Sequence, residues 1–211
     1  FGTLVHETIE DVHRAAIRGE VDKITNDNIA SWFESNYHSL VKSEHTYLAE
    51  PQRNAALKQV ERYAERMNGK WSSIQQAEVD VSLVKEDYII DGKIDLVKGD
   101  NGTVEIVDFK SEQKPDMVKM RDRLEHYRRQ LQIYAYLIEQ RTGQKVSKMH
   151  LYYTEENGNP MITYPYTKTA IEGSVAAFDD TVHKILEKDF NHRCDDIKTC
   201  KNCDFRYYCN K

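Results

Sequence analysis

Residues 88–110 read YIIDGKIDLVKGDNGTVEIVDFK and predict a β-hairpin. Apolar residues dominate both halves, and the Asp-Asn-Gly at 100–102 between them is a strong turn signal. Asp95 lies in the first strand, while Asp108 and Lys110 lie two apart in the second and therefore share a face. A turn at this position brings Asp95 close to the level of Asp108. The hairpin thus predicts two carboxylates and an ammonium group on one patch of sheet.

Two carboxylates side by side are unfavourable without a cation, and Mg²⁺ or Mn²⁺ resolves the conflict because hard cations prefer carboxylate oxygens. Such an ion activates water and stabilises charge on a phosphodiester, and the lysine would then sit near the attacking water. The ordinary alternative is an exposed hairpin whose Asp108 and Lys110 form a common cross-strand ion pair.

The rest of the chain alternates between helical and strand patterns. Apolar spacing predicts one helix between Thr3 and Gly19 and further helices at 26–40, 51–68, 124–141 and 170–186. The polar stretch 68–76 is expected to close the helical part. Period-two patterns predict strands at 77–85, 88–97, 104–109 and 146–153, and a short extra strand at 161–166. This order predicts an α/β fold, a mixed sheet flanked by helices.

Length and composition exclude several classes of protein. The chain has 211 residues, 39% of them hydrophobic, with only short apolar runs, which fits one large domain and no membrane-spanning helix. The net charge is −5, unlike that of a histone-like protein, although a local basic patch still permits nucleic-acid binding. Residues 114–129 form such a patch, with six basic and three acidic residues. This patch either holds phosphates or is a solvated helix face.

Cysteines gather at one end of the chain. None occurs in residues 1–193, and four follow, namely Cys194, Cys200, Cys203 and Cys209. This distribution is atypical of a disulfide-bonded secreted protein and favours a metal or iron–sulfur site in a reducing, cytoplasmic compartment. Four thiolates suit either tetrahedral Zn²⁺ or a [4Fe–4S] cluster.

These motifs together resemble the PD-(D/E)XK nuclease superfamily, in particular its RecB-like exonuclease branch. The resemblance rests on Gly92-Lys93-Ile94-Asp95 and Asp108-Phe109-Lys110, on His6 in the first helix, on Gln130 and Tyr134 in a Gln-x-x-x-Tyr motif, and on the cysteine-rich end. It covers residues 1–211 in order.

The resemblance implies a restriction-endonuclease-like core of helix, three strands, helix and strand, with extra N-terminal helices and a Cys-rich C-terminal tail. It implies a Mg²⁺- or Mn²⁺-dependent DNA nuclease, acting on single strands or duplex ends and often joined to a helicase in the same chain or complex. By position, His6, Asp95, Asp108 and the Phe109 carbonyl would hold the metal. Lys110 would be the catalytic lysine, and Gln130 and Tyr134 would contact DNA or position the site.

The domain expectation follows the same resemblance. Residues 1–190 are expected to form the nuclease domain, with a helical insertion at 20–76, and residues 191–211 the Cys-rich tail. The resemblance favours [4Fe–4S] over Zn²⁺. In iron–sulfur relatives three C-terminal cysteines combine with one far upstream, before the first helix, so Cys194 either replaces that residue or is a bystander. Because the sequence begins with Phe1 and not Met, we expect it to be part of a longer chain.

Two alternatives remain open from sequence. One is a catalytically inactive DNA-binding module that keeps the fold and a structural metal cluster. The other is a metal-bound protein–protein adaptor, which leaves the Asp95, Asp108 and Lys110 pattern unexplained. The roles of two acidic residues stay open. Glu10 would either orient His6 or be solvated. Glu78 opens the first strand and is expected to face solvent, as glutamates at strand edges commonly do, with a place near the site as the alternative.

Overall fold

The computed structural model describes residues 1–100, 102–189, 197–201, 203–204 and 206–207. Its helices are α1 (Gly2–Ile17), α2 (Asn26–Glu44), α3 (Glu50–Met67), α4 (Arg121–Thr142), α5 (Lys168–Leu186) and α6 (Ile197–Lys201), with short 3₁₀ helices at Val21–Lys23 and Trp71–Ser73. Its strands are β1 (Ile74–Val84), β2 (Ile89–Asp100), β3 (Thr103–Lys110), β4 (Lys145–Tyr153) and β5 (Met161–Pro165).

The five strands form one mixed sheet in the order β1-β2-β3-β4-β5. The β1–β2, β2–β3 and β4–β5 pairs are antiparallel, and β3 and β4 are parallel because α4 crosses over between them. This topology confirms the predicted helix, three strands, helix and strand. The short extra strand at the end is β5.

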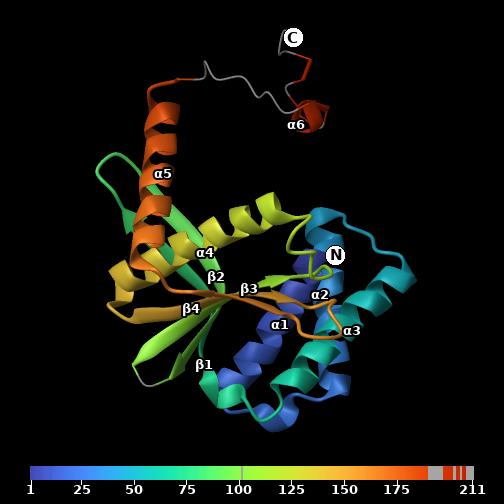
Figure 1. Ribbon diagram of the computed structural model, residues 1–211. Coiled ribbons are helices and arrows are strands. Elements are labelled where there is room, and N and C mark those ends of the chain that lie inside the picture. Colours follow the sequence, from blue (N-terminus) through green and yellow to red (C-terminus); the bar gives the residue numbers. More distant parts are fainter. Residues whose placement is uncertain (101, 190–196, 202, 205, 208–211) are drawn as a thin grey trace.

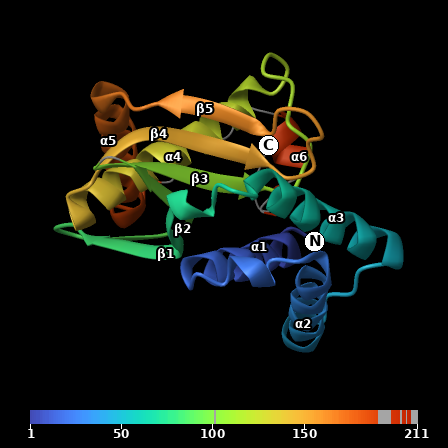
Figure 2. The same ribbon diagram turned by 90° about the horizontal axis from the view of Figure 1, so that it is seen from below.

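Helices cover both faces of the sheet (Figures 1 and 2). On one face, α1, α2 and α3 bury apolar side chains against β2, β3 and β4, including Leu4, Phe33, Tyr63 and Phe109. On the other face, α4 and α5 pack a second cluster against the strands. The sheet thus separates two cores, and β2 and β3 contribute to both of them.

Local signals explain most element boundaries. Thr25 caps α2, its Oγ1 accepting a hydrogen bond of 3.3 Å from the Asn28 backbone nitrogen. Helix α4 ends at Gly143, whose φ of 70° is the left-handed conformation that glycine adopts without strain. One boundary prediction was wrong, because β1 starts at Ile74, inside the stretch 68–76 expected to lie outside the sheet. Pairing of Ile74 with Lys98 across a bulge extends the strand despite its polar residues.

Among the helices of the described residues, none combines the length and apolarity needed to cross a membrane.

Candidate active site

The two predicted carboxylates lie at the same level of adjacent strands. Leu96 on β2 pairs with Val107 on β3 in antiparallel register. Asp95 and Asp108, the neighbours of this pair, therefore lie opposite each other on the two strands. Asp95 Oδ2 accepts a hydrogen bond of 2.6 Å from the backbone nitrogen of Phe109. This bond ties the carboxylate of β2 to the backbone of β3, in the middle of the Asp-Phe-Lys motif.

Asp108 is a buried acid with one cationic neighbour. Asp108 is 6% exposed, and its Oδ2 lies 2.6 Å from Lys110 Nζ. Burial raises the pKa of Asp108 to about 6; the Lys110 charge opposes this rise and the Asp95 charge adds to it. Asp108 Oδ2 is buried and has no hydrogen-bond partner of normal geometry among the described residues. The site therefore carries more negative charge and acceptor capacity than its own residues satisfy.

Lys110 is held from the opposite side by an aromatic ring. Its Nζ lies 4.2 Å from the centroid of the Tyr127 ring, a cation–π contact supplied by α4. Arg123 Nε donates a hydrogen bond of 3.0 Å to the Tyr127 hydroxyl, and Arg123 in turn pairs with Glu112 at 2.5 Å. Sequence reasoning missed Tyr127. Its position one turn before the Gln-x-x-x-Tyr motif, on the same helix face as Gln130, was the available signal.

His6 approaches the site from α1. Its Nδ1 lies 3.7 Å from Asp95 Oδ2, and its ring meets Phe109 edge-on at 6.3 Å. Burial lowers the pKa of His6, but the Asp95 carboxylate, with smaller contributions from Asp108 and Glu78, outweighs burial and raises it. The structure thus brings His6 to the two carboxylates, 89 residues before Asp95 in the chain.

An acidic cleft of about 420 Å³ opens beside His6 and Asp95, and its lining includes Glu7, Glu10 and Glu78. The expectation that Glu78 faces solvent was wrong. Its side chain is 14% exposed and pairs with Lys93 at 2.6 Å, and its backbone φ is 50°, in the left-handed region. Burial raises the pKa of Glu78, with Lys93 opposing and Asp95 adding to the rise. The cleft thus holds a partly buried glutamate in a strained backbone conformation beside Asp95.

The Gln-x-x-x-Tyr motif lies on the α4 side. Gln130 Nε2 donates a hydrogen bond of 3.0 Å to the Tyr134 hydroxyl. The Tyr134 ring covers Gly92, because a Cβ atom built on Gly92 would lie 3.0 Å from Tyr134 Cε1. Burial raises the pKa of Tyr134, and the charges of Asp108 and Asp95 add to the rise. The motif glycine and the motif tyrosine are therefore packed against each other, within electrostatic reach of both carboxylates.

The donor set suits a hard divalent cation. Within the described residues, no three His, Cys, Asp or Glu side chains are grouped closely enough to form a complete metal site. Yet Asp95 and Asp108 supply oxygens at one level of the sheet, and buried Asp108 Oδ2 has the Lys110 ammonium as its one close polar contact among the described residues. His6 lies beside Asp95. Carboxylate oxygens with one imidazole match the ligand preferences of Mg²⁺ or Mn²⁺.

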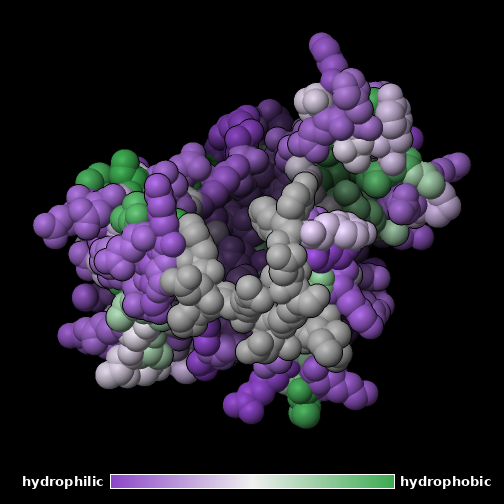
Figure 3. All heavy atoms as spheres, turned by 90° about the horizontal axis from the view of Figure 1, so that it is seen from above, coloured by the Kyte–Doolittle hydropathy of each residue, from purple (hydrophilic) through white to green (hydrophobic). Residues whose placement is uncertain are grey.

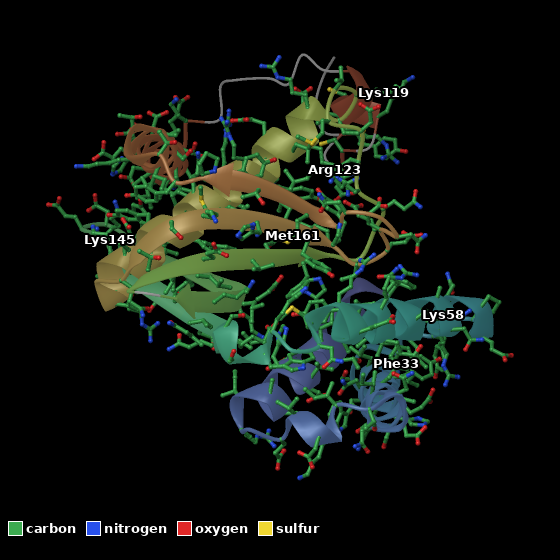
Figure 4. All side chains as sticks on the ribbon, turned by 60° about the horizontal axis from the view of Figure 1, so that its bottom comes forward. Phe33, Lys58, Lys119, Arg123, Lys145 and Met161 are labelled. Atoms are coloured by element: carbon green, nitrogen blue, oxygen red, sulfur yellow. The ribbon has the colours of Figure 1, made fainter. Side chains whose placement is uncertain are left out.

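Part of the basic stretch is engaged by neighbouring residues. Lys114 Nζ donates to the carbonyls of Asn159 and Met161, and Arg123 pairs with Glu112. Arg128 and Arg129 both pair with Glu125. Lys119 and Arg121 have no ion pair among the described residues. The six basic residues of the stretch are Lys114, Lys119, Arg121, Arg123, Arg128 and Arg129. Figure 4 shows Lys119 and Arg123 at the start of α4, on the side of the sheet away from Phe33 and Lys58. The stretch is therefore in part a structural anchor for the loop before α4.

The cysteine tail is only partly within the described residues. Cys200 belongs to α6, and the Cys203 backbone nitrogen donates to the Cys200 carbonyl at 3.3 Å. Cys194 and Cys209 lie outside the described residues. The predicted four-cysteine cluster therefore stays a prediction.

The mixed sheet presents two carboxylates and a lysine on adjacent antiparallel strands, and a crossover helix follows them. This arrangement defines the class of protein as a nuclease of the restriction-endonuclease-like fold. The sequence profile of the PD-(D/E)XK nuclease superfamily matches residues 1–210, and the chain belongs to this superfamily.

A solved structure agrees on the fold. A protein of Eubacterium rectale, named as a candidate exonuclease, is 17% identical with a TM-score of 0.52; the match covers 92% of this chain and 73% of that chain. A second structure, SSO0001, is 16% identical with a TM-score of 0.42, and the match covers 98% of this chain and 83% of that chain. No curated protein matches the sequence.

Proposed function

We propose that the protein is a Mg²⁺- or Mn²⁺-dependent deoxyribonuclease of the RecB-like branch, acting as an exonuclease on DNA ends. Membership of the superfamily supports nuclease activity, and the similarity to the Eubacterium rectale protein supports the exonuclease assignment. The observation that carries the proposal is the group of Asp95, Asp108 and Lys110, in which two carboxylates on adjacent strands share one ammonium group and Asp108 is buried.

Each residue has a distinct task in this proposal. Asp95 and Asp108, with His6 and the Phe109 carbonyl, would hold the divalent cation. When bound, the cation supplies an activated water and stabilises charge on the scissile phosphate. Lys110 leaves its ion pair with Asp108 and donates hydrogen bonds to the attacking water or to the phosphate oxygen that gains charge.

The α4 residues orient these groups and the substrate. Through its cation–π contact, Tyr127 would hold the Lys110 ammonium in position. Gln130 and Tyr134, joined by their hydrogen bond, present amide and hydroxyl groups to the DNA strand beside the cleaved bond.

The test is cleavage of end-labelled single-stranded DNA with Mn²⁺ or Mg²⁺, with the protein purified anaerobically to preserve any iron–sulfur cluster. Wild type should cleave only with metal, and Lys110→Ala should lose cleavage by at least about 100-fold while keeping its fold. The matched control is Lys98→Ala, a lysine of β2 that belongs to neither motif. Equal cleavage by wild type and Lys110→Ala overturns the assignment, and DNA binding without cleavage by wild type establishes the inactive binding module instead.

Exonuclease action has its own test. A covalently closed single-stranded circle should resist cleavage under conditions that degrade the linear strand of the same sequence. Cleavage of both at similar rates would show endonuclease action at the same site.

The resemblance also extends the proposal to the protein's context. We propose that the domain serves a helicase-linked DNA repair or recombination protein, and that Cys194, Cys200, Cys203 and Cys209 hold a [4Fe–4S] cluster, with Zn²⁺ as the alternative. Iron, acid-labile sulfide and zinc content of the anaerobically purified protein distinguish the two. Serine substitution of Cys200 should lower whichever metal is present, and unchanged content would remove Cys200 from the ligand set.

A further inference from the structure

A second cavity, of about 530 Å³, lies between α4, α5 and β2. We call it the base cavity. Most of its walls are apolar, with Ile133 and Leu137 from α4 and Ala177 and Phe178 from α5. Phe178 is 38% exposed, and its ring lies 6.3 Å from that of Tyr88, which restricts its orientation. A half-exposed aromatic ring in an apolar recess offers a stacking surface for a planar group.

The base cavity adjoins the candidate active site through the Gln-x-x-x-Tyr motif. Gln130 and Tyr134 line it, and Tyr134 also packs on Gly92 of the motif that carries Asp95. A strand whose phosphate sits at Asp95 and Asp108 would therefore pass Tyr134 and bring a neighbouring nucleotide to the cavity.

Charge at the rim suits a nucleotide. Arg129 and His126 lie on the α4 side of the cavity. The Arg129 side chain is 65% exposed, and its contact with Glu125, at 3.7 Å, is an exposed ion pair of the kind that contributes little. A phosphate can replace that contact. Asp91 is the acidic residue of the lining, on the β2 side, where its carboxylate can accept a hydrogen bond from the amino group of a base.

We propose that the base cavity binds a nucleobase of the DNA strand that flanks the cleaved bond, stacked on Phe178, with its phosphate near Arg129. This inference rests on the proposed function. It specifies the substrate as a DNA strand in which the base next to the cleaved bond is not stacked in a duplex. Because the walls are apolar and aromatic, the cavity accepts bases by stacking, with little dependence on sequence.

Binding is measured by fluorescence anisotropy in the Lys110→Ala background, so that the strand stays intact. The probes are labelled oligothymidylate of about 16 nucleotides and a strand of the same length made only of abasic sugar-phosphate units. The parent should prefer the base-bearing strand. Phe178→Ala, and Ala177→Trp as a cavity-filling variant, should each reduce that preference by about tenfold. Phe178→Trp should retain it, and Asp180→Ala, a neighbouring α5 residue outside the lining, should behave as the parent.

Two results would overturn the proposal. One is an unchanged preference in both cavity variants, shown to be folded by circular dichroism. The other is equal weakening for both strands, which would mean that Phe178 affects backbone contacts and not a base. Either result is distinguishable from failure of the nuclease assignment, which the cleavage assay of wild type against Lys110→Ala tests independently.

Discussion

Lys110 lies between a carboxylate and an aromatic ring, 2.6 Å from Asp108 Oδ2 and 4.2 Å from the Tyr127 centroid. If the ring positions the ammonium, its removal should slow the reaction more than it weakens substrate binding. Tyr127→Leu is expected to lower kcat by about fivefold, the equivalent of about 1 kcal/mol for a cation–π contact. Tyr127→Phe keeps the ring and should retain most of the rate. Steady-state kinetics with a saturable DNA substrate provide the measurement, and equal loss in both variants would assign the effect to the hydroxyl.

His13 is a buried histidine directly behind the site. It is 1% exposed, its Nε2 lies 2.6 Å from the Tyr63 hydroxyl, and its ring packs near Phe109. Burial lowers the pKa of His13 to about 3, from an ordinary value of 6.5. A lowered histidine pKa contributes stability that is present above pH 6.5 and is lost as pH falls from 6.5 toward 3.

The free energy of unfolding should therefore fall, on account of His13, by up to about 1.4 kcal/mol per pH unit below pH 6.5. A His13→Leu variant removes the titrating group and should show a shallower acid slope, whatever its stability at neutral pH. Urea denaturation of both proteins between pH 7 and 5 tests this. Parallel slopes would mean that other groups govern acid unfolding.

At the scale of elements, the site depends on how α4 lies against β2. Gly92 allows the Tyr134 ring to reach the sheet, and an added methyl group would meet that ring at 3.0 Å. Gly92→Ala should displace Tyr134 by a few tenths of an ångström, with a loss of about 1 kcal/mol in stability and about tenfold in activity. Adding Tyr134→Leu to Gly92→Ala should cost less than the sum of the two single changes, because leucine lacks the ring atoms that the added methyl group would meet. Full additivity would contradict the packing described.

Sequence periodicity was sufficient for the elements but not for every side-chain environment. Alternation in 77–110 and the Asp-Asn-Gly turn predicted the register that places Asp95 beside Asp108. The burial of Glu78 and the role of Tyr127 depend on tertiary contacts with Lys93 and Lys110, which no local pattern encodes. The pairing of Lys114 with backbone carbonyls likewise shows that local charge does not reveal which cations are available to a ligand.

At the scale of the whole molecule, the candidate site lies where the two cores meet at the sheet. Residues from α1, β2, β3 and α4 converge on Asp95 and Asp108, and the face seen from above in Figure 3 is mostly hydrophilic and hollowed near its centre. A ligand that neutralises Asp108 would thus connect elements from both layers. It should stabilise the fold as a whole and not one segment.

Divalent metal should consequently raise the melting temperature. At 100 times the dissociation constant, a cation that binds only the native state adds about 2.7 kcal/mol, equivalent to several degrees for a chain of this size. Asp95→Asn should lose most of this shift, and chelation should return wild type to the metal-free value. Differential scanning fluorimetry with Mn²⁺ measures it, and an equal shift in Asp95→Asn would place the bound metal elsewhere.

The most direct test of the account is the cleavage rate of end-labelled single-stranded DNA with Mn²⁺ by Asp108→Asn beside Glu105→Gln. Both residues belong to β3, but Glu105 pairs with Lys148 and His150, away from the candidate site. We expect the cleavage rate of Asp108→Asn to be at least about 100-fold below that of wild type, and the rate of Glu105→Gln to be close to that of wild type. Cleavage by Asp108→Asn at the wild-type rate would contradict the assignment of the active site.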